Sequence, residues 1–226
     1  METSIAENLR RVRSTVPAGV RLLAVSKFKP AEDIMAAYDA GQRLFGENHA
    51  TEMRDKHQAL PKDIEWHFIG HLQSNKVKYI APFVSLIHSI DSLDLLRVVE
   101  KEGAKNGRVI PCLLQYHVAA EETKFGLSEQ EGEALLASED FRAMRHVRIV
   151  GVMGMATNTP DMDKVRADFR RLKALFDSLK ARHFANSADF GELSMGMSHD
   201  YQEAIQEGST LVRIGSSIFG QRVATA

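Results

Sequence analysis

The hydrophobic and polar positions of the chain alternate between two periods. Short apolar runs rich in Leu, Ile and Val are each followed by a segment in which apolar residues recur three or four positions apart. The first pattern is typical of buried β-strands and the second of amphipathic α-helices. The expected strands are residues 22–25, 43–45, 65–69, 84–88, 109–117, 147–153, 192–195 and 210–214. The expected helices begin near residues 5, 31, 49, 74, 93, 128, 161 and 198.

Local signals support these helices. Gly41 and Gly208 stand where helices are expected to stop, and Ser128 with Glu131 three residues later forms a capping-box pattern. The helix beginning at Asp161 is the longest, and its apolar residues form one stripe. These residues are Val165, Phe169, Leu172, Leu175, Phe176 and Leu179.

Eight strands, each followed by a helix or a terminal turn, predict a parallel (β/α)₈ TIM barrel preceded by one extra helix. The periodicity does not reveal whether the sheet closes, so an open doubly wound sheet is the alternative. We find no linker, low-complexity tract or change of composition, and we therefore expect a single domain over residues 1–226.

Composition narrows the function. The chain has 226 residues, 44% of them hydrophobic and 26% charged, with a formal net charge of −1. This balance gives no field that favours nucleic acid or a membrane surface, and no apolar run is long enough to span a bilayer. The first residues lack the apolar segment of a signal peptide, and the single cysteine, Cys112, lies in an apolar run. We expect a cytoplasmic protein with a buried thiol.

The first expected strand leads directly into a candidate nucleophile. Leu22–Val25 is followed by Lys27, and Pro30 then opens a helical pattern. The carboxyl ends of strands carry the chemistry of such barrels. A lysine held there among apolar side chains is partly desolvated, which frees its amine to attack a carbonyl. Lys27 is therefore a Schiff-base candidate; the alternative is an ordinary loop lysine whose amine reaches water.

Two glycine-bearing loops follow the last two strands. Ser194–Ser198 comes after the seventh strand and Ile214–Ser217 after the eighth. Barrels commonly bind phosphate there, because glycines let backbone N–H groups approach an anion. Taken singly, Gly196 and Gly215 are explained by turns and Ser198 by helix capping. Together, opposite Lys27, they indicate a phosphorylated carbonyl compound held at both ends.

The motifs of the chain resemble one family. They span residues 22–220 and are LLAVSKFKP, FGEN, WHFIGHLQSNKVK, HSID, KFG, LSMGMSHDYQEAI and GSTLVRIGSSIFG. This combination resembles the pyridoxal-phosphate homeostasis proteins (the YggS/PROSC family), which share the barrel of the alanine racemase N-terminal domain. The resemblance therefore implies a barrel of the alanine racemase N-terminal-domain type.

The resemblance also implies a cofactor and its contacts. Pyridoxal 5′-phosphate (PLP) would be bound to Lys27 as an internal aldimine. Ser198 and Gly215–Ser216 would hold its phosphate, Arg213 would face the pyridine nitrogen, and Asn48 would lie beside the ring. No metal is implied.

The expected function is that of a PLP-binding protein in intracellular vitamin B6 homeostasis, without a dedicated turnover reaction. A guanidinium at the ring nitrogen, as expected of Arg213, only donates hydrogen bonds and favours the unprotonated ring, which weakens the electron sink. Racemisation also needs a second base, which alanine racemases take from an additional domain of the partner subunit. We expect a monomer that delivers PLP to apo PLP-dependent enzymes. The alternatives are a weakly active PLP-dependent racemase and a Schiff-base aldolase on the same barrel.

Other residues have two interpretations. His67 and His71 are separated by Gly70 within a strand that turns into a loop, so we expect barrel-interior packing for His67 and no metal site. Glu47 and Asp91, at strand ends, are candidate bases or exposed loop carboxylates. Four methionines are expected to line the mouth of the barrel: Met153, Met155, Met195 and Met197.

Overall fold

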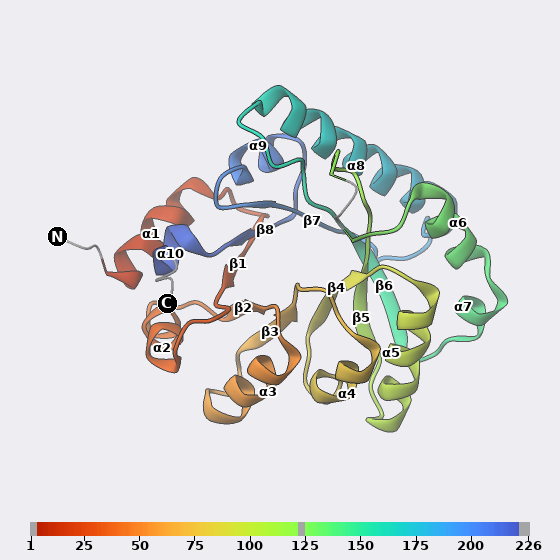
Figure 1. Cartoon of the computed structure of the whole chain (residues 1–226), viewed down its shortest axis with the longest axis horizontal. Helices are drawn as coiled ribbons and strands as arrows, with labels where there is room; N and C mark the ends of the chain where they lie inside the picture. The colour runs from red at the N-terminus through yellow and green to blue at the C-terminus, as the bar shows by residue number, and fades with distance from the viewer. Residues whose placement is uncertain (1–3, 122–124, 222–226) are drawn as a thin grey trace.

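The computed structural model describes residues 4–121 and 125–221, which form a closed barrel of eight parallel strands (Figure 1). Each strand pairs with the next, and the last pairs with the first. The strands are β1 Arg21–Val25, β2 Leu44–Glu47, β3 Glu65–Phe68, β4 Leu86–Ile90, β5 Ile110–Gln115, β6 Val147–Met153, β7 Glu192–Met197 and β8 Leu211–Ile214. The predicted barrel is thus confirmed, and the open sheet is excluded.

Helices surround the barrel, and one extra helix precedes the first strand, as predicted (Figure 1). They are α1 Ile5–Thr15, α2 Ala31–Asp39, α3 Ala50–Ala59, η1 Ser74–Lys76, α4 Val77–Ile80, α5 Leu93–Lys105, α6 Glu129–Ala137, α7 Glu139–Ala143, α8 Met162–His183, α9 Tyr201–Gln206 and α10 Ser216–Phe219. Ser4 and Ser128 close capping boxes at α1 and α6. These caps satisfy the first N–H groups of each helix.

Two helical segments differ from the prediction. The helix expected from residue 198 begins at Tyr201, because the Asp200 carboxylate accepts the Met197 N–H at 2.6 Å and holds residues 198–200 in a turn. The short helix α7 was not predicted; Ser138 ends α6 and its hydroxyl accepts the Phe141 N–H to begin α7. In both cases a local side-chain contact sets the boundary.

The barrel interior contains apolar and polar layers. Two small apolar clusters fill part of it: Leu23, Leu44 and Leu211 in one, and Leu86, Leu113 and Met153 in the other. Polar side chains on strands are buried as well, among them His67, His88, Ser194 and Arg213. Most other buried apolar residues belong to one large cluster, which includes both strand and helix residues. Apart from this polar layer, the strands are therefore apolar on both faces, as expected for a parallel sheet covered by helices.

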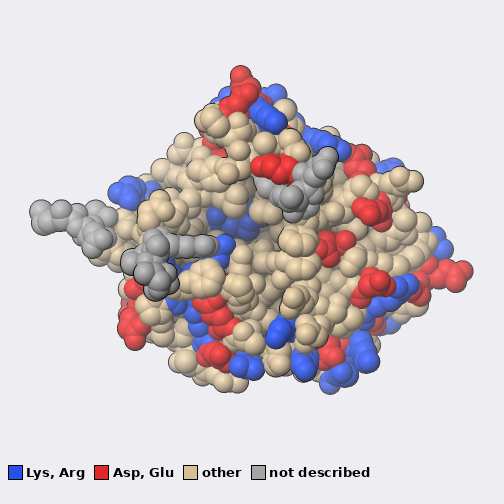
Figure 2. Space-filling model, viewed as in Figure 1, with Lys and Arg blue, Asp and Glu red and all other residues tan. Residues whose placement is uncertain are grey.

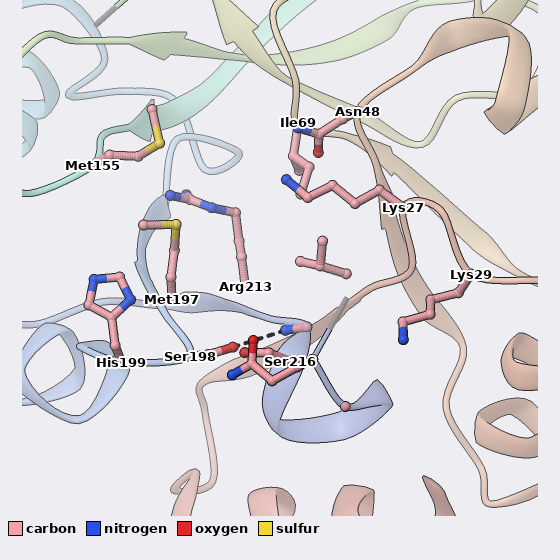
Figure 3. A pocket seen from close by; sticks show the side chains of 14 residues that line it. Lys27, Lys29, Asn48, Ile69, Met155, Met197, Ser198, His199, Arg213 and Ser216 are labelled. Atoms are coloured by element: carbon pink, nitrogen blue, oxygen red, sulfur yellow. Dashed lines mark hydrogen bonds between the residues drawn. The ribbon is translucent and has the colours of Figure 1, made fainter. Parts of the chain in front are cut away.

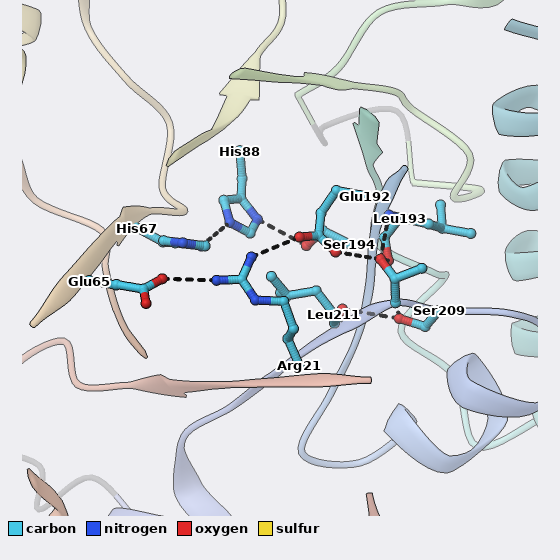
Figure 4. Close-up of polar contacts among 10 residues, drawn as sticks. Arg21, Glu65, His67, His88, Glu192, Leu193, Ser194, Ser209 and Leu211 are labelled. Carbon is cyan, nitrogen blue, oxygen red and sulfur yellow. Dashed lines mark hydrogen bonds and ion pairs between the residues drawn. The ribbon is translucent and has the colours of Figure 1, made fainter. Parts of the chain in front are cut away.

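Ion pairs close the amino-terminal end of the barrel. Arg21 at the start of β1 donates to Glu65 of β3 at 3.0 Å and to Glu192 of β7 at 2.9 Å (Figure 4). These side chains are partly exposed, and this end of a barrel serves stability rather than chemistry. Within the described ranges, no helix combines the length and the apolar character needed to cross a membrane.

Candidate functional site

A pocket of about 480 Å³ opens at the carboxyl ends of the strands (Figure 3). All six residues that the sequence singled out line it: Lys27, Asn48, Ser198, Arg213, Gly215 and Ser216. Its described lining contains three basic side chains, those of Lys27, Lys29 and Arg213, and no acidic one. Figure 2 shows basic side chains in the hollow near the centre of this face, with both signs mixed around its rim. The pocket therefore favours an anionic ligand.

Lys27 lies on a tight turn directly after β1, and its side chain points into the pocket (Figure 3). The next residue, Phe28, has a φ of 61°, a conformation uncommon for a residue with a bulky side chain. Helix α3 stabilises this turn from both sides. The Phe28 N–H donates to Glu52 at 2.7 Å, and the Lys56 ammonium donates to the Ser26 carbonyl at 2.8 Å. The backbone on each side of Lys27 is thus fixed by a charged group.

Glu47 lies beneath this turn and is fully buried. Its Oε1 accepts hydrogen bonds from the Ser26 hydroxyl at 2.5 Å and from the Lys56 ammonium at 2.8 Å. Its Oε2 has no partner within the described residues. Burial raises the pKa of Glu47 to about 7, although the charge of Lys56 opposes this shift. Glu47 is therefore part of the support of the turn.

Both interpretations of Glu47 as an exposed carboxylate or a base in the site are wrong, because it is buried and does not line the pocket. The reason is that β2 turns this side chain towards α3 rather than towards the mouth. Asp91 also lies outside the described pocket lining, and its carboxylate is 3.3 Å from a ring nitrogen of His71.

The burial of Glu47 gives a stability difference that depends on pH. Its pKa lies above the ordinary value of 4.5, so the folded chain binds this proton more tightly than the unfolded chain does. Raising the pH from 4.5 through 7 therefore lowers the free energy of unfolding of the native chain. Glu47→Gln does not lose this contribution, because its side chain cannot ionise. We expect the stability of the native chain relative to Glu47→Gln to fall by up to about 3 kcal/mol between pH 5 and 8. Urea unfolding of both proteins measures this, and a constant difference would contradict the buried carboxyl.

The loops after β7 and β8 meet on the wall opposite Lys27 (Figure 3). The Gly215 N–H donates to the Ser198 hydroxyl at 3.2 Å, which joins the two loops. Helix α10 begins at Ser216, and in the described chain the N–H groups of Ser216 and Ser217 donate to no protein acceptor. Free amides and hydroxyls in one place suit a phosphate group. We call this group of residues, Ser198, Gly215, Ser216 and Ser217, the phosphate-type corner.

The structure explains the glycine at position 215 by packing, and not by a turn or by the approach of an anion. A Cβ at this position would lie 3.1 Å from the carbonyl oxygen of Val25 and 3.2 Å from its Cβ. The absence of a side chain thus lets the loop after β8 pack against the end of β1. Gly215 thus joins the loop after β8 to the strand that leads into the Lys27 turn.

Arg213 projects from β8 and is 4% exposed. Its Nη1 donates to the carbonyl oxygen and the hydroxyl of Ser194, at 3.0 and 2.6 Å, and its Nη2 donates to the Gly154 carbonyl at 3.2 Å. Burial lowers the pKa of Arg213 to about 10, and the charge of Asp200 partly opposes this. The guanidinium therefore stays charged at neutral pH. Three of its five N–H groups are used, which leaves two for a ligand.

Asn48 follows β2 and borders the pocket beside Lys27 (Figure 3). Its Oδ1 is buried without a hydrogen-bond partner among the described residues. A buried amide oxygen without a partner is costly unless another group satisfies it. The Asn48 amide is therefore available to a ligand.

Comparison with known proteins assigns the family. The model of the alanine racemase N-terminal domain matches residues 2–223. A pyridoxal phosphate homeostasis protein of Aquifex aeolicus is 40% identical over 203 residues, covering 89% of this chain and 87% of the relative. The human protein of the same name is 36% identical over 223 residues, covering 94% and 80%. This chain belongs to the pyridoxal phosphate homeostasis protein family.

Solved structures agree with this assignment. PipY of Synechococcus elongatus, in a structure with PLP bound, has a TM-score of 0.86 at 34% identity, covering 96% of this chain and 100% of PipY. An alanine racemase of Clostridium difficile has a TM-score of 0.74 at 11% identity, and 57% of its length is covered. The second likeness concerns the fold alone. It confirms that this member of the pyridoxal phosphate homeostasis protein family has the predicted alanine racemase type of barrel.

The pocket of this family member also has residues that the sequence did not single out. Lys29 lines it, and its ammonium donates to the Phe219 carbonyl at 2.8 Å. His199 lines it from the turn after β7. Lys29 is two residues after Lys27, and His199 directly follows Ser198. This closeness in sequence is the signal that could have identified them.

The methionine prediction was half wrong. Met155 and Met197 line the pocket, whereas Met153 and Met195 are buried away from it. Met153 belongs to an interior cluster of the barrel against which Met155 packs. Met195 belongs to the large cluster that includes helix residues, and the register of β7 shifts between Ser194 and Met197, so the regular alternation of side chains is broken there.

The two histidines lie apart, as predicted. His67 is buried in the barrel interior, and His71 stacks on Phe125 with ring centroids 3.9 Å apart. Across residues 4–121 and 125–221, no group of three side chains is arranged to bind a metal.

Proposed function

We propose that this protein holds PLP in the cytoplasm as a Schiff base on Lys27 and releases it to apo PLP-dependent enzymes, acting as a monomer without a dedicated turnover reaction. The observation that carries the proposal is the placement of Lys27 and the phosphate-type corner on opposite walls of one basic pocket. The PLP-bound structure of PipY, at 34% identity over almost the whole chain, supports PLP as the ligand.

The pocket residues fit PLP. Its aldehyde would condense with the Lys27 amine, with loss of water, and its phosphate would accept from Ser198 and the amides at the start of α10. Arg213 would donate to the ring nitrogen, and the unpartnered Asn48 amide would contact the ring edge. The three basic side chains offset the charge of the phosphate.

Borohydride reduction tests the assignment of Lys27. We expect the purified protein incubated with PLP to absorb in the visible range, and reduction followed by digestion and mass spectrometry to find the phosphopyridoxyl group on Lys27. A label on Lys29 instead, or no label, would refute the proposal.

A second measurement tests the absence of turnover. A guanidinium at the ring nitrogen supports carbanion chemistry poorly. The loaded protein, assayed against a panel of amino acids, should show no more than trace racemisation or transamination. A kcat of about 1 s⁻¹ or more, within the ordinary enzyme range, would show that it is an enzyme.

The phosphate corner predicts graded losses of affinity. Ser198→Ala removes one neutral hydrogen bond and should weaken PLP binding by about three- to tenfold. Gly215→Val should weaken it more than tenfold, because its side chain would displace Val25 and the Lys27 turn. Equilibrium dialysis with PLP and with pyridoxal measures both variants. Equal retention of pyridoxal and PLP by the native protein would show that these loops are only turns.

A further inference from the structure

Three buried polar side chains continue from Arg213 into the barrel interior. The Ser194 hydroxyl lies 2.6 Å from Arg213 Nη1 and 2.9 Å from Nδ1 of His88. Nε2 of His88 lies 2.8 Å from Nδ1 of His67 (Figure 4). Ser194, His88 and His67 are each at most 1% exposed. We call these three residues the interior column.

The guanidinium sets the direction of the first hydrogen bond. Arginine has N–H donors and no acceptor, so the Ser194 oxygen must accept from Arg213. The hydroxyl hydrogen of Ser194 then needs another acceptor, and in the described chain the polar atom within reach is Nδ1 of His88. Nδ1 of His88 is therefore unprotonated.

The direction continues to the second histidine. Burial lowers the pKa of both imidazoles, and Arg213 and Arg21 lower that of His88 further, so both rings are neutral. A neutral imidazole carries one N–H, which in His88 must be on Nε2. It donates to Nδ1 of His67, whose own N–H is then on Nε2. Every hydrogen bond of the column runs away from the pocket.

We propose that Ser194, His88 and His67 are positioning residues that hold Arg213 as a fixed donor towards the ring nitrogen of the cofactor, an inference that rests on the proposed function. Because Ser194 cannot turn its hydrogen towards Arg213, it remains an acceptor for the guanidinium. Together with the carbonyls of Ser194 and Gly154, it orients the guanidinium so that two N–H groups remain for the pocket. The ring nitrogen would then accept a hydrogen bond from the guanidinium of Arg213, and the guanidinium would keep its proton.

The apo protein gives a test that needs no cofactor. In NMR spectra of protein labelled with ¹⁵N-histidine, at pH 7, we expect His67 and His88 both as neutral Nε2–H tautomers. In Ser194→Ala, His88 loses the donor to its Nδ1, and its tautomer populations should shift. An imidazolium at either position, or a native His88 protonated on Nδ1, would overturn the proposal.

PLP labelled with ¹⁵N tests the functional consequence, with Ser209→Ala as the matched control. Ser209, near Leu193 and Leu211 in Figure 4, is also buried, at 4% exposure. Its hydroxyl contacts the carbonyls of Leu193, Met195 and Leu211 rather than the interior column. We expect Ser194→Ala to change the chemical shift of the pyridine nitrogen and to weaken PLP binding about tenfold. Ser209→Ala should leave the shift unchanged and the affinity within about twofold, whatever its loss of stability.

The outcomes separate the two proposals. If the native protein does not bind PLP, the proposed function fails, whereas the apo tautomers still test the column. If the native protein binds PLP and Ser194→Ala behaves like Ser209→Ala in shift and affinity, the positioning role is refuted and the proposed function stands.

Discussion

Lys27→Ala is expected to abolish covalent retention of PLP, so that the loaded variant is colourless after desalting while the native protein keeps its visible absorption. The remaining pocket contacts can hold the phosphate and the ring but cannot form the covalent bond. We expect the apparent affinity to fall by more than about a hundredfold, or about 2.8 kcal/mol. Absorbance and equilibrium dialysis measure the change.

Lys29→Ala provides the control. Lys29 lines the same pocket, and its ammonium already donates to the Phe219 carbonyl. Lys29→Ala should therefore keep the visible absorption. If Lys27→Ala retained PLP covalently while Lys29→Ala did not, Lys29 would be the residue that binds PLP covalently, and the assignment of Lys27 would be wrong.

Delivery to another enzyme follows from the same pair of proteins. An apo PLP-dependent enzyme should be activated faster by the loaded native protein than by Lys27→Ala mixed with the same total PLP. Equal rates of activation would show that the protein binds PLP but does not deliver it, and the carrier function would be withdrawn.

Gly151→Ala is expected to have the largest effect on the fold. Between β5 and β6 the register shifts, since Cys112 pairs with Ile149 and Leu113 with Gly151. At this irregularity a Cβ on Gly151 would lie 1.7 Å from the carbonyl oxygen of Glu192 on β7. Strands β6 and β7 would have to separate. We expect a loss of more than about 4 kcal/mol in the free energy of unfolding, or no folded protein.

Gly191→Ala is the matched control, one residue before Glu192. A Cβ there would meet no heavy atom within 4 Å. Its effect in urea unfolding should stay within about 0.5 kcal/mol. Similar losses from both variants would show that the contact with Glu192 does not decide the stability of this joint.

The strands and the main pocket residues could be predicted because they follow local rules. A strand covered on both faces appears as an uninterrupted apolar run, as in Leu22–Val25, and eight such runs with helices between them predict a parallel sheet covered by helices. The closure of that sheet into a barrel was seen only in the structure. Lys27, Ser198 and Gly215 were found because they stand just beyond strand ends, where barrel sites form. Motif resemblance then added Arg213 and Asn48, which have no distinctive pattern of their own.

The support beneath the pocket could not be predicted for the same physical reason. In a run such as Leu86–Ile90, all five residues are buried, so no alternation indicates that His88 points into the barrel. Its contacts with His67 and Ser194 join strands 21 and 106 residues apart in sequence. Likewise the burial of Glu47 depends on Lys56 of α3, and only the packed structure brings that charge under the Lys27 turn.

The rate at which the Cys112 thiol is modified can report local opening of the barrel. It is fully buried in β5, and burial raises the pKa of its thiol, so a disulfide reagent can modify it only when the surrounding strands part. When closing is faster than reaction, each 1.4 kcal/mol of opening free energy slows modification about tenfold. Because the chain has one cysteine, the reaction follows a single site. In this limit, comparing its rate with and without PLP would measure how much PLP changes the opening free energy of the barrel.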